Sequence, residues 1–177
     1  MLLTWHTGMK WGRNYQFFEC FSGLGRVSKR MHWLGYRVAS FDMIYDKAGS
    51  GCMSFLGAPG FMLCVYVILN QVPEALSLFA PMCASWGAPN RGTSMRSVLN
   101  PSGQMNYRSV QEANTTVSRM TLLALLILSR NGLFLVENPM QTLLQWHRRW
   151  QWLCNRVCYV AWPQYAYCVK LVDLTGL

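Results

Sequence analysis

A complete strand–turn–helix–strand pattern within about thirty residues limits the folds open to this chain more than any other feature of its sequence. Residues 16–20 (QFFEC) form a short β-prone run, and the glycine-containing segment FSGLG follows at once. Apolar residues then recur at helical spacing over 26–34, up to Gly35, which suits a helix C-cap. Residues 37–41 (RVASF) predict a second strand that ends at Asp42. Such a unit predicts two parallel strands joined by a helix.

The same alternation continues along the rest of the chain. Glycine and proline predict a loop over 47–60, and the apolar run 61–70 is compatible with either a short helix or a buried strand. A predicted strand at 75–80 leads into a long polar loop at 85–103. A helix is predicted from Tyr107 to Asn131 and Gly132, with Ser109 and Glu112 at capping-box spacing near its start. The remaining predicted elements are a strand at 133–136, a helix with Leu143, Trp146, Trp150 and Leu153 on one face, and a last strand at 156–162.

Strands that alternate with helices predict an α/β fold, here a Rossmann-like, open, mostly parallel sheet with helices on both faces. A chain of 177 residues is long enough for one domain with a real core and too short for two ordinary domains. We therefore expect a single domain over 16–162, with an N-terminal extension (1–15) and a tail (163–177). Its parallel neighbours should be the strands that end at Cys20, Phe41, Ala80 and Val136.

Targeting and cysteine signals favour a nuclear or cytoplasmic protein that does not enter a membrane. The apolar runs 61–69 and 121–128 are far shorter than the roughly 20 residues that cross hydrocarbon. The N-terminal residues carry no secretion signal. The seven cysteines are odd in number and contain no CxxC pair, which favours reduced thiols over a metal site or a disulfide framework.

The formal net charge of +9, from 16 basic and 7 acidic residues, makes nucleic acid a plausible partner, DNA more than RNA. Twelve of the basic residues are arginines, whose planar guanidinium suits phosphate. A basic surface with no dedicated ligand explains the same charge. Residues 145–152 (QWHRRWQW) would suit base stacking beside phosphate contacts. Their apolar spacing favours a core-facing helix with solvated Arg148 and Arg149.

Three of the seven carboxylates, Glu19, Asp42 and Glu137, fall at or next to the carboxyl end of a predicted strand. In an open parallel sheet this edge binds ligands, although each acid taken alone would also serve as a helix cap or a solvated loop residue. Gly23 and Gly25 let the backbone turn tightly and approach a ligand. Asp42 ends the second predicted strand, about 20 residues after the end of the first one. An acid at this spacing can hold the ribose of a nucleoside ligand. Together these residues predict an adenosine-containing cofactor.

Three motifs resemble the cytosine-5 DNA methyltransferases. FECFSGLG (18–25), followed by GYRVASFD (35–42), looks like the cofactor-binding opening of that family. FAPMCASWG (79–87) resembles its nucleophile loop, and FLVENP (134–139) is similar to its Glu-Asn motif. The motifs occur in the family's order and span about two-thirds of the chain.

This resemblance implies S-adenosylmethionine as cofactor and DNA as substrate. Cys83 would be the thiolate that adds to carbon 6 of a flipped cytosine, and Glu137 the acid that contacts the ring nitrogen and the exocyclic amine. Arg91 and Arg96 would lower the pKa of Cys83 and grip phosphate if their loop folds over the site. The cofactor site implied by the resemblance comprises Phe21, Ser22, Gly23, Gly25 and, on the ribose, Asp42.

The chain also departs from the family. Met82 stands where a second proline is usual, Ala84 stands where a glutamine is usual, and the spacing from Cys83 to Glu137 is longer. The residues after Pro139 are too few for a target-recognition domain, for the family's later arginine-bearing motif, or for the segment that completes the cofactor pocket.

Three interpretations follow from the motifs and the departures. The chain is a methyltransferase or a methyltransferase-derived domain, or it is a basic nucleic-acid-binding module that has lost the chemistry, or it is a fragment that a missing C-terminal region or a partner chain completes. In each case we expect the chain alone to transfer methyl groups poorly.

Overall fold

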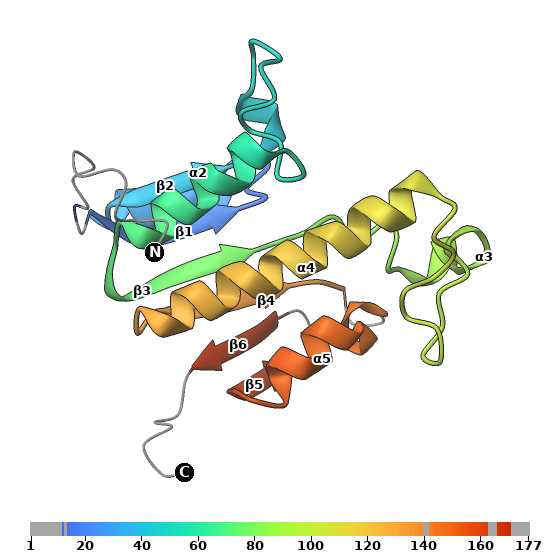
Figure 1. The fold of residues 1–177 in the computed structure, drawn as a ribbon. Helices are drawn as coiled ribbons and strands as arrows, with labels where there is room; N and C mark the ends of the chain where they lie inside the picture. Colours follow the sequence, from blue (N-terminus) through green and yellow to red (C-terminus); the bar gives the residue numbers. More distant parts are fainter. Residues whose placement is uncertain (1–11, 13, 140–141, 163–165, 171–177) are drawn as a thin grey trace, which may run out of the picture.

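A six-stranded sheet with the strand order β2-β1-β3-β4-β6-β5 organises the molecule (Figure 1). The structure is a computed structural model that describes residues 12, 14–139, 142–162 and 166–170. Strands β1 to β4 run parallel, whereas β6 runs antiparallel to β4 and to β5. The strands are β1 (Tyr15–Cys20), β2 (Val38–Phe41), β3 (Gln71–Phe79), β4 (Leu133–Glu137), β5 (Cys158–Trp162) and β6 (Ala166–Lys170).

The carboxyl ends of the four parallel strands meet at one edge, as the sequence predicts. Cys20 pairs with Phe41 on one side and with Phe79 on the other, and Phe79 pairs with Val136. The loops that leave these strands therefore begin side by side. This confirms the α/β, Rossmann-like class and brings the segments that follow β1, β2, β3 and β4 to the same edge.

Helices lie on both faces of the sheet. Three of them, α2 (Ala58–Leu69), α4 (Arg108–Ser129) and α5 (Arg148–Cys154), pack on one face, with α4 lying along β3 and β4 (Figure 1). The fourth, α1 (Arg26–Trp33), packs on the other face against β1 and β2. Because strand side chains alternate between faces, Phe18 and Cys20 enter the core under α2 and α4, and Glu19 points toward α1.

The core lies between the sheet and the three helices α2, α4 and α5. On β4, Phe134 and Val136 are fully buried there, whereas Leu133 and Leu135 on the other face are half-buried. Each fully buried large apolar side chain stabilises the fold by about 1.5–3 kcal/mol. The face of α4 toward the sheet is apolar and buried at Val117, Met120, Leu123, Ala124, Ile127 and Leu128.

Several elements differ from the sequence-based expectation. For the apolar run 61–70, where helix and strand were both open, the structure has a helix. This helix, α2, begins already at Ala58 inside the predicted loop 47–60, because Pro59 near a helix start loses no needed donor. Strand β6 lies within the expected tail and separates β4 from β5. Within the described residues no helix is long and apolar enough to cross a membrane. Short helical turns occur at η2 (Met43–Tyr45), at η3 (Ala88–Asn90) and α3 (Arg91–Ser94) inside the predicted polar loop, and at η4 (Leu144–Trp146) before α5.

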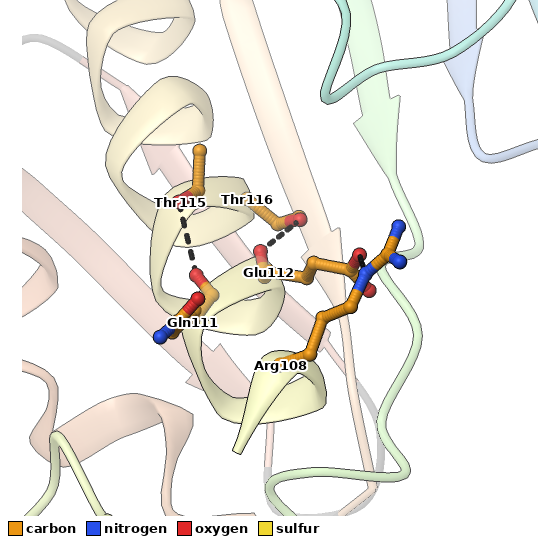
Figure 2. A network of polar contacts seen from close by, with 5 residues as sticks. All are labelled: Arg108, Gln111, Glu112, Thr115 and Thr116. Atoms are coloured by element: carbon orange, nitrogen blue, oxygen red, sulfur yellow. Dashed lines mark hydrogen bonds and ion pairs between the residues drawn. The ribbon is translucent and has the colours of Figure 1, made fainter. Parts of the chain in front are cut away.

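The predicted capping box of α4 is wrong. Tyr107 is the N-cap and makes no side-chain cap, while Glu112 pairs with Arg108, with 2.7 Å between Oε1 and Nε (Figure 2). Thr115 and Thr116 donate to the carbonyls of Gln111 and Glu112, both at 2.9 Å (Figure 2). An exposed i,i+4 pair contributes less than about 1 kcal/mol. The helix is therefore stabilised mainly by its buried face.

Candidate functional site

The strand order reverses between β1 and β3. The chain leaves β1 to form β2 on one side and then returns to form β3 on the other side of β1. In open α/β sheets, ligands bind outside the carboxyl ends of the two strands at such a switch point. Here those ends lead into the turn at 21–25 and the loop at 80–87. Two of the three motifs found in the sequence therefore meet where this fold class binds ligands.

The turn after β1 has an unusual backbone. Phe21, Gly23 and Gly25 all have left-handed φ angles, of 64°, 52° and 65°. Glycine adopts this conformation without steric cost, whereas Phe21 does not, and its ring packs edge-on against Phe55 with centroids 4.7 Å apart. A Cβ at Gly23 would meet nothing within 4 Å. The turn therefore presents bare backbone to open space at Gly23.

Asp42 holds this turn in place. Its Oδ2 accepts a hydrogen bond from the amide of Gly23 at 2.8 Å, and its Oδ1 accepts one from the amide of Ile44 at 3.0 Å. The carboxylate thus ties the end of β2 to the turn that follows β1. Each carboxylate oxygen keeps a further lone pair, so Asp42 still has capacity for two hydroxyl donors.

Ser22 and Gly25 stabilise the conformation of the turn. Ser22 is buried, and its single hydroxyl hydrogen has two acceptors within reach, Tyr45 Oη at 3.0 Å and the more distant carbonyl of Phe41 at 3.4 Å. A Cβ at Gly25 would lie 2.9 Å from Tyr45 Oη. Of the predicted cofactor-binding residues, Gly23 and Asp42 thus face the outside of the turn, while Ser22 and Gly25 maintain its shape.

Glu19, the third carboxylate at the strand ends, has a structural position. It is 5% exposed, and its Oε2 accepts the amide of Ser28 at 2.7 Å. An acid at a helix N-terminus satisfies a free amide and complements the helix dipole. Glu19 therefore fixes the start of α1 and leaves the earlier amides of that turn for a ligand.

Cys83 and Glu137 lie at the same edge of the sheet. Cys83 is exposed in the turn after β3, where its carbonyl accepts the amides of Trp86 at 2.9 Å and Gly87 at 3.0 Å. Two hydrogen bonds join this loop to the segment after β4. The side-chain amide of Asn138 donates to the Pro81 carbonyl at 3.3 Å, and the backbone amide of Leu143 donates to the Trp86 carbonyl at 3.0 Å.

Two acceptor groups at the end of β4 have no partner among the described residues. The Glu137 carboxylate is half-buried and makes no hydrogen bond or ion pair there. The next residue, Asn138, is 2% exposed, and its Oδ1 is buried without a donor. Carboxylate and amide oxygens left unpaired at one position are suited to a ligand that donates hydrogen bonds.

Arg96 does not occupy the predicted phosphate-binding position. It is 3% exposed, and burial lowers its pKa to about 10. All five guanidinium N–H groups have acceptors, and each acceptor is uncharged. The bonds run to Ser85 Oγ (3.1 and 3.0 Å), the Pro101 carbonyl (2.5 Å), Asn114 Oδ1 (2.9 Å) and the Val110 carbonyl (3.3 Å). Arg96 therefore has no donor left for phosphate or for a cysteine thiolate.

Trp86 lies between Arg96 and His147. The Arg96 guanidinium carbon is 3.6 Å from the indole centroid, and the His147 ring meets the indole edge-on with centroids 5.7 Å apart. His147 is 6% exposed, and its Nδ1 has no partner among the described residues. Burial, then Arg96, then Arg149 lower the pKa of His147 to about 4. The imidazole is therefore neutral at physiological pH.

The other predicted residues have simpler positions. Arg91 is exposed at the start of α3, and the core-facing interpretation of 145–152 is confirmed, because Trp150 is buried while Arg148 and Arg149 are exposed. Burial raises the pKa of Cys154 to about 11, and burial together with Cys64 raises the pKa of Cys20. No group of three metal-ligating side chains occurs in the part of the chain that the structure describes.

Trp86, Asn138 and His147 were not predicted as site residues. Asn138 had a local signal, since it follows Glu137 inside a recognisable motif. Trp86 and His147 had none, because their contacts join segments about sixty residues apart in the chain. Comparison with models of known protein families and with curated proteins finds no match.

His147 should make the stability of the fold depend on pH. The unfolded chain binds a proton at His147 below about pH 6.5, whereas the folded chain binds it only near pH 4, so stability falls as the pH drops through this window. Between pH 7 and pH 5 the free energy of unfolding should fall by about 1–2 kcal/mol from this residue. His147→Phe keeps an aromatic ring beside Trp86 and should remove that loss. Urea unfolding at both pH values measures it, and an unchanged pH dependence in the variant would refute the assignment.

Proposed function

We propose that this chain is an S-adenosylmethionine-binding domain of the methyltransferase type, with a site like that of the cytosine-5 DNA methyltransferases. The observation that carries the proposal is the left-handed turn at 21–25, which lies at the switch point of the sheet with Asp42 held against it. This combination of an exposed glycine backbone and an acid on the next strand suits a nucleoside-containing ligand.

The residues around the turn fit the parts of this cofactor. Asp42 has acceptor capacity for the two ribose hydroxyls, and the open side of Gly23 admits close approach to the backbone. Met43 and Ile44, which directly follow Asp42, are 67% and 54% exposed. Such apolar side chains beside a ribose site would pack on a purine base. The start of α1 would favour the cofactor's carboxylate, because helix N-termini attract anions.

The second half of the site would hold the base that receives the methyl group. When bound, the cofactor supplies an electrophilic methyl group. Cys83 is the exposed thiol at this edge. As a thiolate it would add to carbon 6 of cytosine as the double bond between carbons 5 and 6 opens, and it would leave again when carbon 5, once methylated, loses its proton. Glu137 has a carboxyl group free to pair with the ring nitrogen and the exocyclic amine, and in its protonated form it would relieve the charge that attack builds on the ring.

The position of Arg96 does not support catalysis, and it leaves cofactor binding unaffected. A cation near a thiol lowers the thiol pKa and promotes attack, and the sequence suggested Arg96 for that task. With its five donors occupied by neutral acceptors, Arg96 instead supports the loop. We therefore propose that the chain binds the cofactor and transfers methyl groups weakly or not at all.

A nucleic-acid-binding module without catalysis is the second candidate function. The net charge is +9, and Arg108–Glu112 is the single salt bridge within the described residues. Most of the basic side chains there are therefore not neutralised by a carboxylate, which favours phosphate backbones as partners. Cofactor binding separates the two candidates.

Calorimetric titration with S-adenosylmethionine and with its demethylated product tests the first candidate. Binding should be measurable for the unchanged chain, and Gly23→Leu should weaken it by about tenfold or more, because the side chain would fill the space in front of the turn. Gly49→Leu is the matched control, since Gly49 also has a left-handed φ and open space around it but lies outside the site. Both variants carry a similar backbone strain of about 1–2 kcal/mol.

Equal affinity of Gly23→Leu and Gly49→Leu would place the cofactor elsewhere. No binding to the unchanged, folded chain would reject the first candidate and leave the second.

Methyl transfer and covalent trapping test the separation of binding from chemistry. We expect labelled S-adenosylmethionine to give little or no transfer to duplex DNA, and DNA containing 5-fluorocytosine to form little covalent adduct with the chain. A flipped base would seldom reach Cys83 without further contacts to hold it. Robust turnover that disappears in Cys83→Ser, with Cys52→Ser as the exposed-cysteine control, would show the chain to be a competent enzyme.

A further inference from the structure

We propose that the exposed face of α1 is a binding surface for single-stranded nucleic acid. Arg26, Lys29, Arg30 and Trp33 stand at positions i, i+3, i+4 and i+7 of this helix, so they share one face. We call these four residues the α1 stripe. The proposal deepens the nucleic-acid-binding candidate above and does not depend on cofactor binding.

The α1 stripe faces solvent and carries charge that no carboxylate neutralises. All four residues are exposed, whereas Ser28 on the opposite side is buried against Glu19. The first turn of the helix contains no acid, and among the described residues none of the three cations forms a salt bridge. Three positive charges therefore lie along about 6 Å of helix.

Two of these three charges oppose the stability of the helix itself, whereas Arg30 lies in the last turn, where a cation is favourable. Arg26 and Lys29 lie in or next to the first turn, where the positive end of the helix dipole disfavours cations by about 0.3–1 kcal/mol each. A folded chain that keeps such charges exposed and unpaired gains nothing from them in folding. Features that conflict with local stability are expected where a surface has a function.

Trp33 distinguishes this surface from a purely electrostatic one. Its side chain is 71% exposed, and the Arg30 guanidinium carbon lies 4.2 Å from the ring centroid. Tyr36 and Arg37, both exposed, continue the same mixture just beyond the helix. Exposed aromatic rings between cations are how proteins stack unpaired bases while contacting the backbone phosphates.

Other polyanions fit the α1 stripe less well. Duplex DNA offers phosphates but no free base face for Trp33. An interfacial membrane helix needs a wide apolar face free to enter the lipid, and in α1 the face opposite the stripe packs on β1 and β2. A single strand uses both the cations and the aromatic ring.

Helix α5 and the turn directly after it carry a similar group of residues and provide a charge-matched control. Arg148, Arg149 and Arg156 are exposed, and Arg156 lies over Trp152 with 4.2 Å between the guanidinium carbon and the ring centroid. However, Arg156 already donates to the Trp152 carbonyl at 3.1 Å, and Trp152 is less exposed than Trp33. This group lies on or directly after α5, which packs on the face of the sheet opposite to α1.

Fluorescence anisotropy with a labelled 20-nucleotide oligothymidine, without cofactor, tests the proposal. The triple variant Arg26→Ala/Lys29→Ala/Arg30→Ala should bind about tenfold or more weakly, and its log–log salt slope should fall by about 2, because each phosphate contact contributes roughly 0.7 for single strands. The triple variant Arg148→Ala/Arg149→Ala/Arg156→Ala removes the same charge and should lose less. Circular dichroism checks that both variants fold.

Trp33 provides the second readout. Trp33→Ala should weaken oligothymidine binding about fivefold or more, Trp33→Phe should retain most of it, and neither should change binding to a 20-base-pair duplex. Equal losses in the two triple variants, or no effect of Trp33→Ala, would overturn the proposal. Binding to anionic vesicles with none to oligothymidine would also overturn it. Because no cofactor is present, failure here leaves the S-adenosylmethionine titration unaffected.

Discussion

The arrangement of the carboxyl edge depends on one buried cation, Arg96, stacked on Trp86. A guanidinium taken out of water without a carboxylate partner is costly unless all of its donors are satisfied. Here five hydrogen bonds to four neutral acceptor atoms satisfy it, and the acceptors come from the loop after β3, from the segment that precedes α4 and from the first turns of α4. The pKa of about 10 leaves Arg96 charged at neutral pH. One residue thus joins three segments, and Trp86 extends the connection to Leu143 after β4.

The edge consequently has two halves that are built differently. On the β1 and β2 side, Asp42 fixes the Gly23 turn through backbone amides and leaves an open surface. On the β3 and β4 side, Cys83 stands on the loop after β3 and Glu137 ends β4. Arg96 fixes this loop, and Asn138 joins it to the segment after β4. The first half therefore offers a nucleoside ligand an open glycine backbone and a carboxylate that accepts hydrogen bonds. The second half has a thiol and a carboxylate, but Arg96 has no free donor to activate the thiol. We therefore expect the chain to bind the cofactor and to transfer methyl groups weakly or not at all.

Local patterns predicted most of the fold, and long-range contacts account for the errors. Periodicity and turn residues are local signals. They predicted that strands β1 to β4 run parallel, and they predicted the long helix α4. Strand β6 was missed because its pairing with β4 and β5 is not encoded in its own short segment. Asp42 and Gly23 were assigned to one predicted cofactor site; the hydrogen bond between them was not predicted, because spacing along the chain does not specify it. The burial of Arg96 was not predicted either, because its acceptors lie as far as Asn114, 18 residues along the chain.

Hydrogen–deuterium exchange with and without S-adenosylmethionine tests whether the cofactor binds at the switch point between β1 and β3, because it locates the ligand on the unmodified chain. We expect slower amide exchange at residues 21–25 and 42–45 when the cofactor is added, with little change in α5. Protection confined to other segments, or exchange that does not change at saturating cofactor, would contradict a cofactor site at the switch point between β1 and β3.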